Sequence, residues 1–185
     1  MRENTSQSFL AKQLSVKETL LSLGMIAPIL LYMILFLYAW FFSDDLLFRP
    51  PRPSYRDTSD IIKLPTHDGI KISARYVSNP QAYFTILYSH GQSEDLGDSE
   101  DALVMLRKMG LAVFAYDYEG YGTGQGTPSE QHAYRDIDAA YDYLTGTLAV
   151  LPDRIIAYGF SMGGGPQVST RVLRPLAHAR RMRLP

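Results

Sequence analysis

The chain has 185 residues, a formal net charge of −1 and no cysteine. This length allows about one globular domain, and the nearly balanced charge argues against a general nucleic-acid binder. The absence of cysteine excludes disulfide bonds, thiolate metal sites and thiol catalysis. Hydrophobic residues make up 46% of the chain, which is enough for a packed core.

The first feature along the chain is an uncharged, strongly apolar stretch from Thr19 to Phe42. About 20 such residues in a helix cross a hydrocarbon core of roughly 30 Å. A cleaved signal peptide has a shorter apolar stretch, and this one ends in bulky aromatic residues instead of a small-residue cleavage site. The pattern predicts a polar segment over 1–18 and one membrane-spanning helix over 19–42. The lipid bilayer is therefore an expected partner.

The orientation of this span stays open. Basic residues before it, Arg2, Lys12 and Lys17, are balanced by Arg49, Arg52 and Arg56 after it. The positive-inside rule needs an excess on one side. The sequence therefore predicts a single-pass membrane protein, and the side on which the following domain lies is undetermined.

A Pro-rich connector, 43–57, separates the span from a domain over 58–185. Proline favours extended backbone, so the connector is expected to be stiff. It is either a solvated stalk or a segment whose arginines contact anionic lipid headgroups. Two β-prone runs, 61–64 and 70–77, then flank Asp68-Gly69, a pattern that predicts a hairpin.

Strands and helices alternate from residue 83 onward. Strands are expected over 83–88, 111–116 and 153–160, and helices over 99–109 and 129–144, where apolar residues recur at helical spacing. This order predicts the α/β class, with a mostly parallel sheet and helices on both of its faces.

No metal or cofactor site is expected. The acidic run Asp95, Asp98, Glu100 and Asp101 lies where a helix begins, and the helix dipole explains it more simply than a bound cation does. The glycines from 120 to 126 lack the spacing of a phosphate-binding loop. His67 and His132 are expected to be surface residues.

A candidate nucleophile, Ser161, follows the last predicted strand in the sequence Gly159-Phe160-Ser161-Met162-Gly163. A nucleophilic serine of this kind projects from a tight, strained turn between a strand and a helix. Glycines at 159 and 163 remove the Cβ clashes that such a turn produces. The five-residue pattern is weak by itself, and its place directly after a strand strengthens it.

A second element, Ser89-His90-Gly91-Gln92, ends an earlier predicted strand. In a hydrolase with this turn, one oxyanion-hole N–H belongs to the residue after the nucleophile and another to the loop after an earlier strand. The donors are then the backbone amides of Met162 and Gln92.

Six segments together resemble the α/β-hydrolase superfamily: 88–91, 94–97, 116–122, 126–130, 136–140 and 159–166. The most similar branch contains membrane-anchored serine hydrolases such as protein depalmitoylases, with serine-aminopeptidase-like and monoacylglycerol-lipase-like enzymes. The resemblance implies cofactor-free ester or thioester hydrolysis of an acyl substrate, which is a lipid, an acylated protein or a small ester. It also implies that His90 and Gly91 are structural residues of the loop beside the site.

Two departures from this family stand out. The first is Glu119, at a position where the family commonly has Arg. The second concerns the segment after the serine, where the family has its acid and its histidine in chain order. Residues 162–185 contain no acid and a single histidine, His178. The sequence therefore predicts a hydrolase domain that is truncated and inactive as written. The alternative is a non-catalytic, membrane-tethered fragment or binding module.

Overall fold

The protein is described by a computed structural model that covers residues 2–169, with side chains described from 26 to 168. His178 and the segment on which the expected truncation rests lie outside these residues. The chain divides into two compact units, Met1–Ser43 and Asp44–Pro185.

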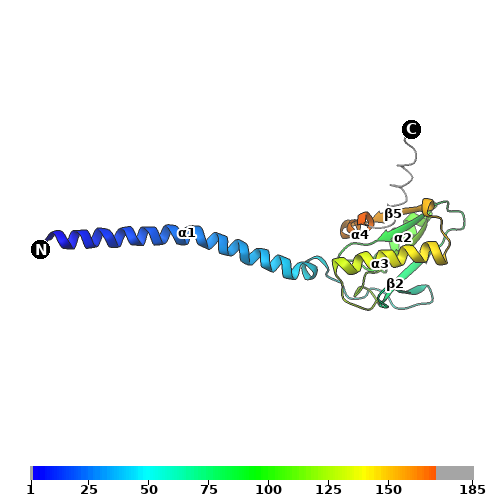
Figure 1. Ribbon diagram of the computed structural model, residues 1–185. Helices are drawn as coiled ribbons and strands as arrows, with labels where there is room; N and C mark the ends of the chain where they lie inside the picture. The colour runs from blue at the N-terminus through cyan, green and yellow to red at the C-terminus, as the bar shows by residue number, and fades with distance from the viewer. Residues whose placement is uncertain (1, 170–185) are drawn as a thin grey trace, which may run out of the picture. The chain divides into compact units, whose positions relative to one another are not determined.

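Helix α1 (Arg2–Leu47) contains the apolar stretch (Figure 1). Its window from Ile26 to Leu47 has a mean hydropathy of 2.0 and exposed side chains, so its length and composition would allow it to cross a membrane. The backbone leaves helical geometry at Phe42, with φ −117° and ψ 16°. The helix thus continues past the predicted end at residue 42, with a kink at that point.

The second unit is built on a five-stranded sheet in the order β1-β2-β4-β3-β5. Its strands are β1 (Ile61–Pro65), β2 (Lys71–Val77), β3 (Thr85–Ser89), β4 (Ala112–Tyr116) and β5 (Ile155–Gly159). The β1–β2 hairpin is antiparallel and joins β4 in an antiparallel pair, whereas β3 pairs in parallel with both β4 and β5. The predicted hairpin and the predicted parallel strands are confirmed.

Two helices cover opposite faces of this sheet: α2 (Glu100–Lys108) and α3 (Glu130–Asp142). Helix α3 begins at Ser129, whose hydroxyl accepts the His132 amide at 3.1 Å and caps the helix. A π-helical turn (Tyr143–Thr147) follows α3, and short 3₁₀ turns occupy Pro152–Arg154 and Ser161–Gly163 before α4 (Gly164–Ser169).

Alternate residues of each strand supply two separate cores. In β4, Phe114 and Tyr116 pack with the residues of α3, and Val113 and Ala115 pack with those of α2. Successive side chains of a strand point to opposite faces, so one apolar strand can serve both cores. This two-sided burial explains why the strands read as continuous apolar runs in the sequence.

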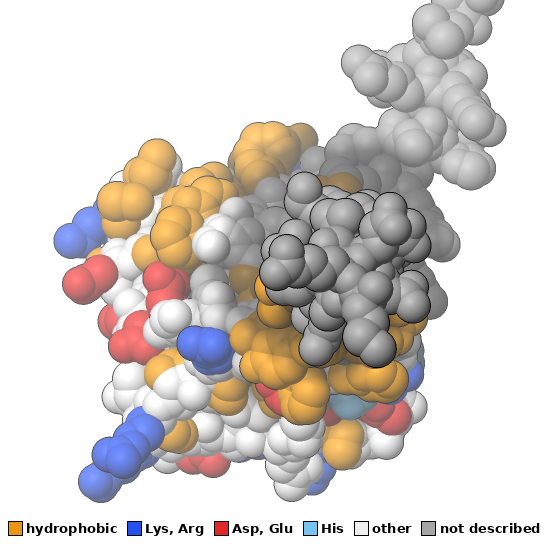
Figure 2. Space-filling view, turned by 90° about the vertical axis from the view of Figure 1, so that its left-hand side faces the viewer, with side chains coloured by type: hydrophobic (Ala, Val, Ile, Leu, Met, Phe, Trp, Pro, Cys, Tyr) orange, Lys and Arg blue, Asp and Glu red, His pale blue; other side chains and the backbone are white. Residues whose placement is uncertain are grey.

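Strand β5 is less covered than its neighbours. Among the described residues it pairs with β3 alone, and Ile156 and Tyr158 are 38% and 42% exposed. Figure 2 shows one face of the molecule, where hydrophobic side chains lie between scattered acidic and basic ones. The strand is therefore an edge of the sheet within the part of the chain that the structure describes.

The connector packs on the second unit and is not a solvated stalk along its length. Phe48 is 5% exposed and meets the Tyr118 ring edge-on at a centroid distance of 6.4 Å. The backbone N–H of Ser54 donates to Asp95 at 2.7 Å. Ahead of the prolines, Asp44 accepts the Glu130 amide at 3.1 Å. The stalk prediction is wrong because the residues flanking the prolines have buried or hydrogen-bonded partners in the domain.

Replacing Phe48 by Ala should destabilise the second unit. Truncating a buried Phe to Ala costs about 3 to 5 kcal/mol, because it removes apolar contacts and leaves a cavity. Phe84→Ala is the matched control, since Phe84 is already 38% exposed. Urea unfolding of the full chain in detergent micelles measures both losses. Equal losses in the two variants would show that Phe48 is not part of the core.

Asp95 should make stability depend on pH in the acidic range. Its burial by itself raises the carboxyl pKa, but hydrogen bonds from Ser54 and from the amides of Gly97 and Asp98 outweigh this and hold the pKa below 3.8. A depressed carboxyl pKa contributes stability that is present above the unfolded-state pKa and is lost as pH falls through the folded-state pKa.

Asp95→Asn should therefore lose about 1.5 to 3 kcal/mol at pH 7, the usual contribution of hydrogen bonds to a charged group. The difference from wild type should shrink below pH 4. Asp101→Asn, at an exposed position of α2, serves as the control. Unfolding curves from pH 7 to pH 3 provide the measurement. A difference that persists unchanged at pH 3 would rule out this charge effect.

Candidate active site

Ser161 lies on the sharp turn between β5 and α4. Its φ is 51°, a left-handed conformation that is uncommon for a residue with a side chain and costs about 1 to 3 kcal/mol. A Cβ added at Gly159 would lie 2.4 Å from the Gly163 carbonyl oxygen, so only glycine fits this turn. The serine is exposed. This is the strained strand-turn-helix geometry in which a nucleophilic serine is presented.

The turn with Ser161 lies directly against the loop after β3. The Phe160 amide donates to the Ser89 carbonyl at 2.9 Å, and a Cβ on Gly163 would lie 2.2 Å from the same oxygen. A Cβ on Gly91 would come within 3.1 Å of the Phe160 ring. The structure therefore brings together the segments that contain Gln92 and Met162.

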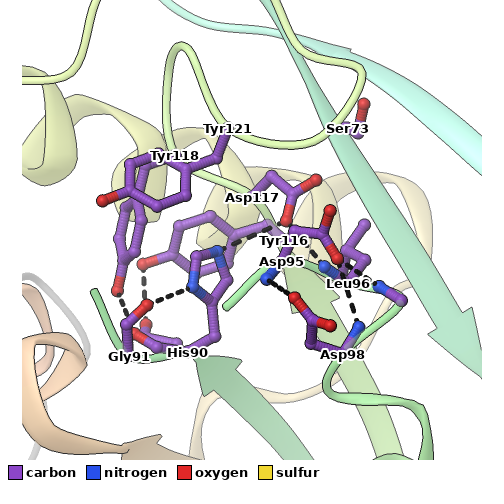
Figure 3. A network of polar contacts seen from close by, with 12 residues as sticks. Ser73, His90, Gly91, Asp95, Leu96, Asp98, Tyr116, Asp117, Tyr118 and Tyr121 are labelled. Carbon is purple, nitrogen blue, oxygen red and sulfur yellow. Dashed lines mark hydrogen bonds and ion pairs between the residues drawn. The ribbon is translucent and has the colours of Figure 1, made fainter. Parts of the chain in front are cut away.

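His90 is fixed inside the loop after β3 (Figure 3). It is 1% exposed; Nδ1 donates to the Gly91 carbonyl at 2.8 Å, and Nε2 lies 3.3 Å from Oδ1 of Asp117. The same Asp117 oxygen accepts the Leu96 amide at 2.9 Å. Both ring nitrogens face the loop and its support, an arrangement suited to holding the loop.

Two tyrosines complete this support, and the sequence analysis assigned them no role. The Tyr118 hydroxyl donates to the His90 carbonyl at 3.0 Å, and that of Tyr121 donates to the Gln92 carbonyl at 3.0 Å. Burial raises the pKa of Tyr121 to about 12, so its hydroxyl stays protonated and remains a donor. The Tyr121 oxygen also accepts the Arg49 amide at 3.1 Å. The close succession of tyrosines after β4 was the only feature of the sequence that could have indicated this supporting role.

A buried glutamine ties α4 to the sheet. The Gln167 amide nitrogen donates to the Leu87 carbonyl at 2.9 Å and to the Ser89 hydroxyl at 2.8 Å. Ser89 also shares a hydrogen bond of 2.7 Å with the Tyr116 hydroxyl. The helix that follows the serine is thereby fixed to β3, the strand that leads into the His90 loop. Sequence reasoning missed this residue.

Within residues 2–169, no acid or base forms a hydrogen bond or an ion pair with the serine. Among the described residues, the Ser161 hydroxyl has no hydrogen bond or ion pair, and the His90 ring is turned into its own loop. The acidic run before α2 also differs from a row of solvated carboxylates, because Asp95 is buried and accepts hydrogen bonds from Ser54 and nearby amides. No cation is needed to explain that run.

Residues 80–181 match the sequence model of the family described as serine aminopeptidase S33, over more than half of the chain. The alpha/beta hydrolase domain-containing protein 17B of Xenopus tropicalis is 36% identical over 115 residues, which are 61% of this chain and 40% of that protein. The Caenorhabditis elegans alpha/beta hydrolase domain-containing protein aho-3 is 41% identical over 99 residues, which are 53% of this chain and 30% of that protein. The chain thus spans well under half the length of these relatives.

The fold also matches solved structures. The esterase Pf2001 of Pyrococcus furiosus aligns with a TM-score of 0.52 at 22% identity, covering 72% of this chain and 52% of that chain. Such a likeness concerns the fold alone, while the match to the family model concerns the sequence as well. The match to the family model establishes that the chain belongs to the serine aminopeptidase S33 family of α/β-hydrolases, and the turn geometry at Ser161 agrees with it.

Proposed function

We propose that the protein is a membrane-anchored serine hydrolase that cleaves acyl esters or thioesters. The observation that carries this proposal is the left-handed Ser161, held on a glycine-flanked turn against the loop after β3. Such a turn is costly to maintain, and it presents a hydroxyl at the carboxyl ends of parallel strands.

In the proposed reaction, Ser161 Oγ attacks the acyl carbonyl carbon and its proton passes to a general base. The carbonyl oxygen becomes an oxyanion, which the backbone amides of Gln92 and Met162 stabilise. Collapse of this intermediate breaks the ester or thioester bond, and the protonated base gives its proton to the leaving alcohol or thiol. Water then hydrolyses the acyl-enzyme that remains. In this fold the acid and the histidine follow the serine in chain order, and the proposal assigns those roles to no described residue.

The proposed substrate is an acyl chain attached to a molecule at the membrane surface. The contact that supports this runs from the Gln92 side-chain amide to the Leu46 carbonyl, at 3.3 Å, near the end of α1. If the apolar part of α1 spans the bilayer, the second unit follows it directly in sequence and is tethered at the membrane–water interface. Acylated proteins and lipids present their carbonyl groups at that interface, and small esters reach it from water.

The second candidate is a non-catalytic, membrane-tethered binding module. The observation favouring it is that the Ser161 hydroxyl has no hydrogen-bond partner in the described part of the chain. A serine without a general base is a poor nucleophile. The two functions differ in whether Ser161 reacts covalently.

A fluorophosphonate probe applied to membranes containing the full chain should label wild type and not Ser161→Ala. Removing a catalytic serine costs on the order of 10⁶-fold in rate, so the loss should be complete within detection. Ser78→Ala, at an exposed position after β2, should label like wild type. Wild-type labelling no stronger than that of Ser161→Ala would contradict the hydrolase proposal and favour the binding module.

Membrane attachment through α1 is tested by placing charge in its apolar part. Full-length protein should stay in the membrane pellet through carbonate extraction at high pH, and Leu31→Lys combined with Leu35→Lys should release it. Each lysine at the centre of a span costs about 2.5 to 3.5 kcal/mol. Leu151→Lys, at an exposed site of the second unit, is the control and should remain in the pellet. Retention of the double-lysine variant would show that α1 is not the anchor.

A further inference from the structure

Three ionisable side chains from distant parts of the sequence converge beside the start of α3. Asp68 lies in the β1–β2 turn, Glu119 in the loop after β4 and His132 in the first turn of α3. One potential ligand atom of each lies within 4.8 Å of those of the other two. Sequence reasoning had placed His132 on the surface and had looked for a cation site only in the run near Asp95.

Glu119 is the unusual member of this group. It is 1% exposed, and its Oε1 has no hydrogen-bond partner in the described structure. Its Oε2 lies 3.1 Å from Nδ1 of His132. A buried carboxylate oxygen without a partner is costly, because it has lost its water without replacement. The Asp136 carboxyl group accepts the Glu119 backbone amide at 3.0 Å, so a second buried carboxyl group lies beside the first.

The donor atoms around Nδ1 of His132 have the spacing of neighbouring ligands around one ion, and the Asp68 oxygen lies within 4.8 Å of those of Glu119 and His132. Besides its 3.1 Å distance to Glu119, Nδ1 of His132 lies 2.8 Å from the Thr127 carbonyl oxygen. Ligands at about 2.0 to 2.2 Å from a zinc ion are separated from one another by about 3 Å. The contacts of His132 with Glu119 and Thr127 therefore already have ligand spacing, and Asp68 would complete the set by moving toward them.

The carboxylate of Asp68 is held in place by two residues that are not among the three potential ligands. Arg135 donates to its Oδ2 at 2.8 Å, and the Thr66 hydroxyl donates to its Oδ1 at 2.5 Å. Such outer contacts fix the direction of a ligand carboxylate and offset part of its charge. In the described part of the chain Arg135 forms its ion pair with Asp68, and Oε1 of Glu119 accepts no hydrogen bond.

We propose that Asp68, Glu119 and His132 bind a divalent transition-metal ion of the zinc type, with the Thr127 carbonyl as a further ligand. One imidazole and two carboxylates suit zinc, whereas calcium prefers six to eight oxygen ligands. The ion would take the place of the proton that Nδ1 now shares with Thr127, and a neutral imidazole would then carry its one proton on Nε2. It would link the β1–β2 turn, the loop after β4 and the start of α3.

Titration of the metal-free full chain in detergent micelles with zinc chloride, followed by calorimetry, tests this site. We expect one zinc ion per chain, with affinity reduced at least tenfold in Glu119→Gln and in His132→Gln. His67→Gln is the matched control, because His67 adjoins Asp68 in sequence yet contacts Asp142, at 3.4 Å. Its affinity should equal that of wild type. No binding, or an equal loss in His67→Gln, would overturn the proposal.

A second measurement uses wild type and does not depend on whether the variants fold. The chain has four histidines, so the ¹⁵N resonances of their imidazoles can be followed individually. Zinc should move the Nδ1 resonance of His132 out of the range of protonated nitrogen, and the proton should appear on Nε2 instead. A His132 resonance that does not respond to zinc would overturn the proposal even if ions bind elsewhere.

Discussion

The arrangement of the candidate site depends on the close backbone contact between the ends of β3 and β5. The Phe160 amide reaches the Ser89 carbonyl, and Gly163 lies so near that carbonyl that a single added carbon would collide with it. This contact brings the serine turn and the His90 loop together at the carboxyl edge of the parallel strands. Side chains from α4, from the tyrosines after β4 and from the connector then hold the two loops.

Much of this support is polar and buried. His90, Asp117 and the tyrosines 118 and 121 lie below one-tenth exposure and bond to backbone groups that no strand or helix satisfies. Buried polar groups are stable only when they are paired, so the network specifies one loop conformation. The strained φ of Ser161 is maintained within this setting.

The sequence predicted the α/β class, the hairpin and the position of the serine turn because each leaves a local pattern. Alternating apolar runs identify strands, and Gly159 and Gly163 flank the turn. Contacts between distant segments leave no such pattern. The pairing of Gln167 with β3, of Tyr121 with Gln92 and of Glu119 with His132 depends on the order of strands in space. The prediction for the connector was wrong because it rested on the prolines, whereas the buried side chain of Phe48 packs on the domain.

The packing of the connector also determines where the folded unit begins. Asp44 caps the first turn of α3, Phe48 fills part of the core, and the Arg49 amide bonds to the hydroxyl that holds Gln92. A shortened chain that starts after the prolines would keep the sheet but would lose all three of these contacts. The boundary for a soluble version of the domain therefore lies within the end of α1, before Asp44, and the Pro-rich segment is an internal part of the fold.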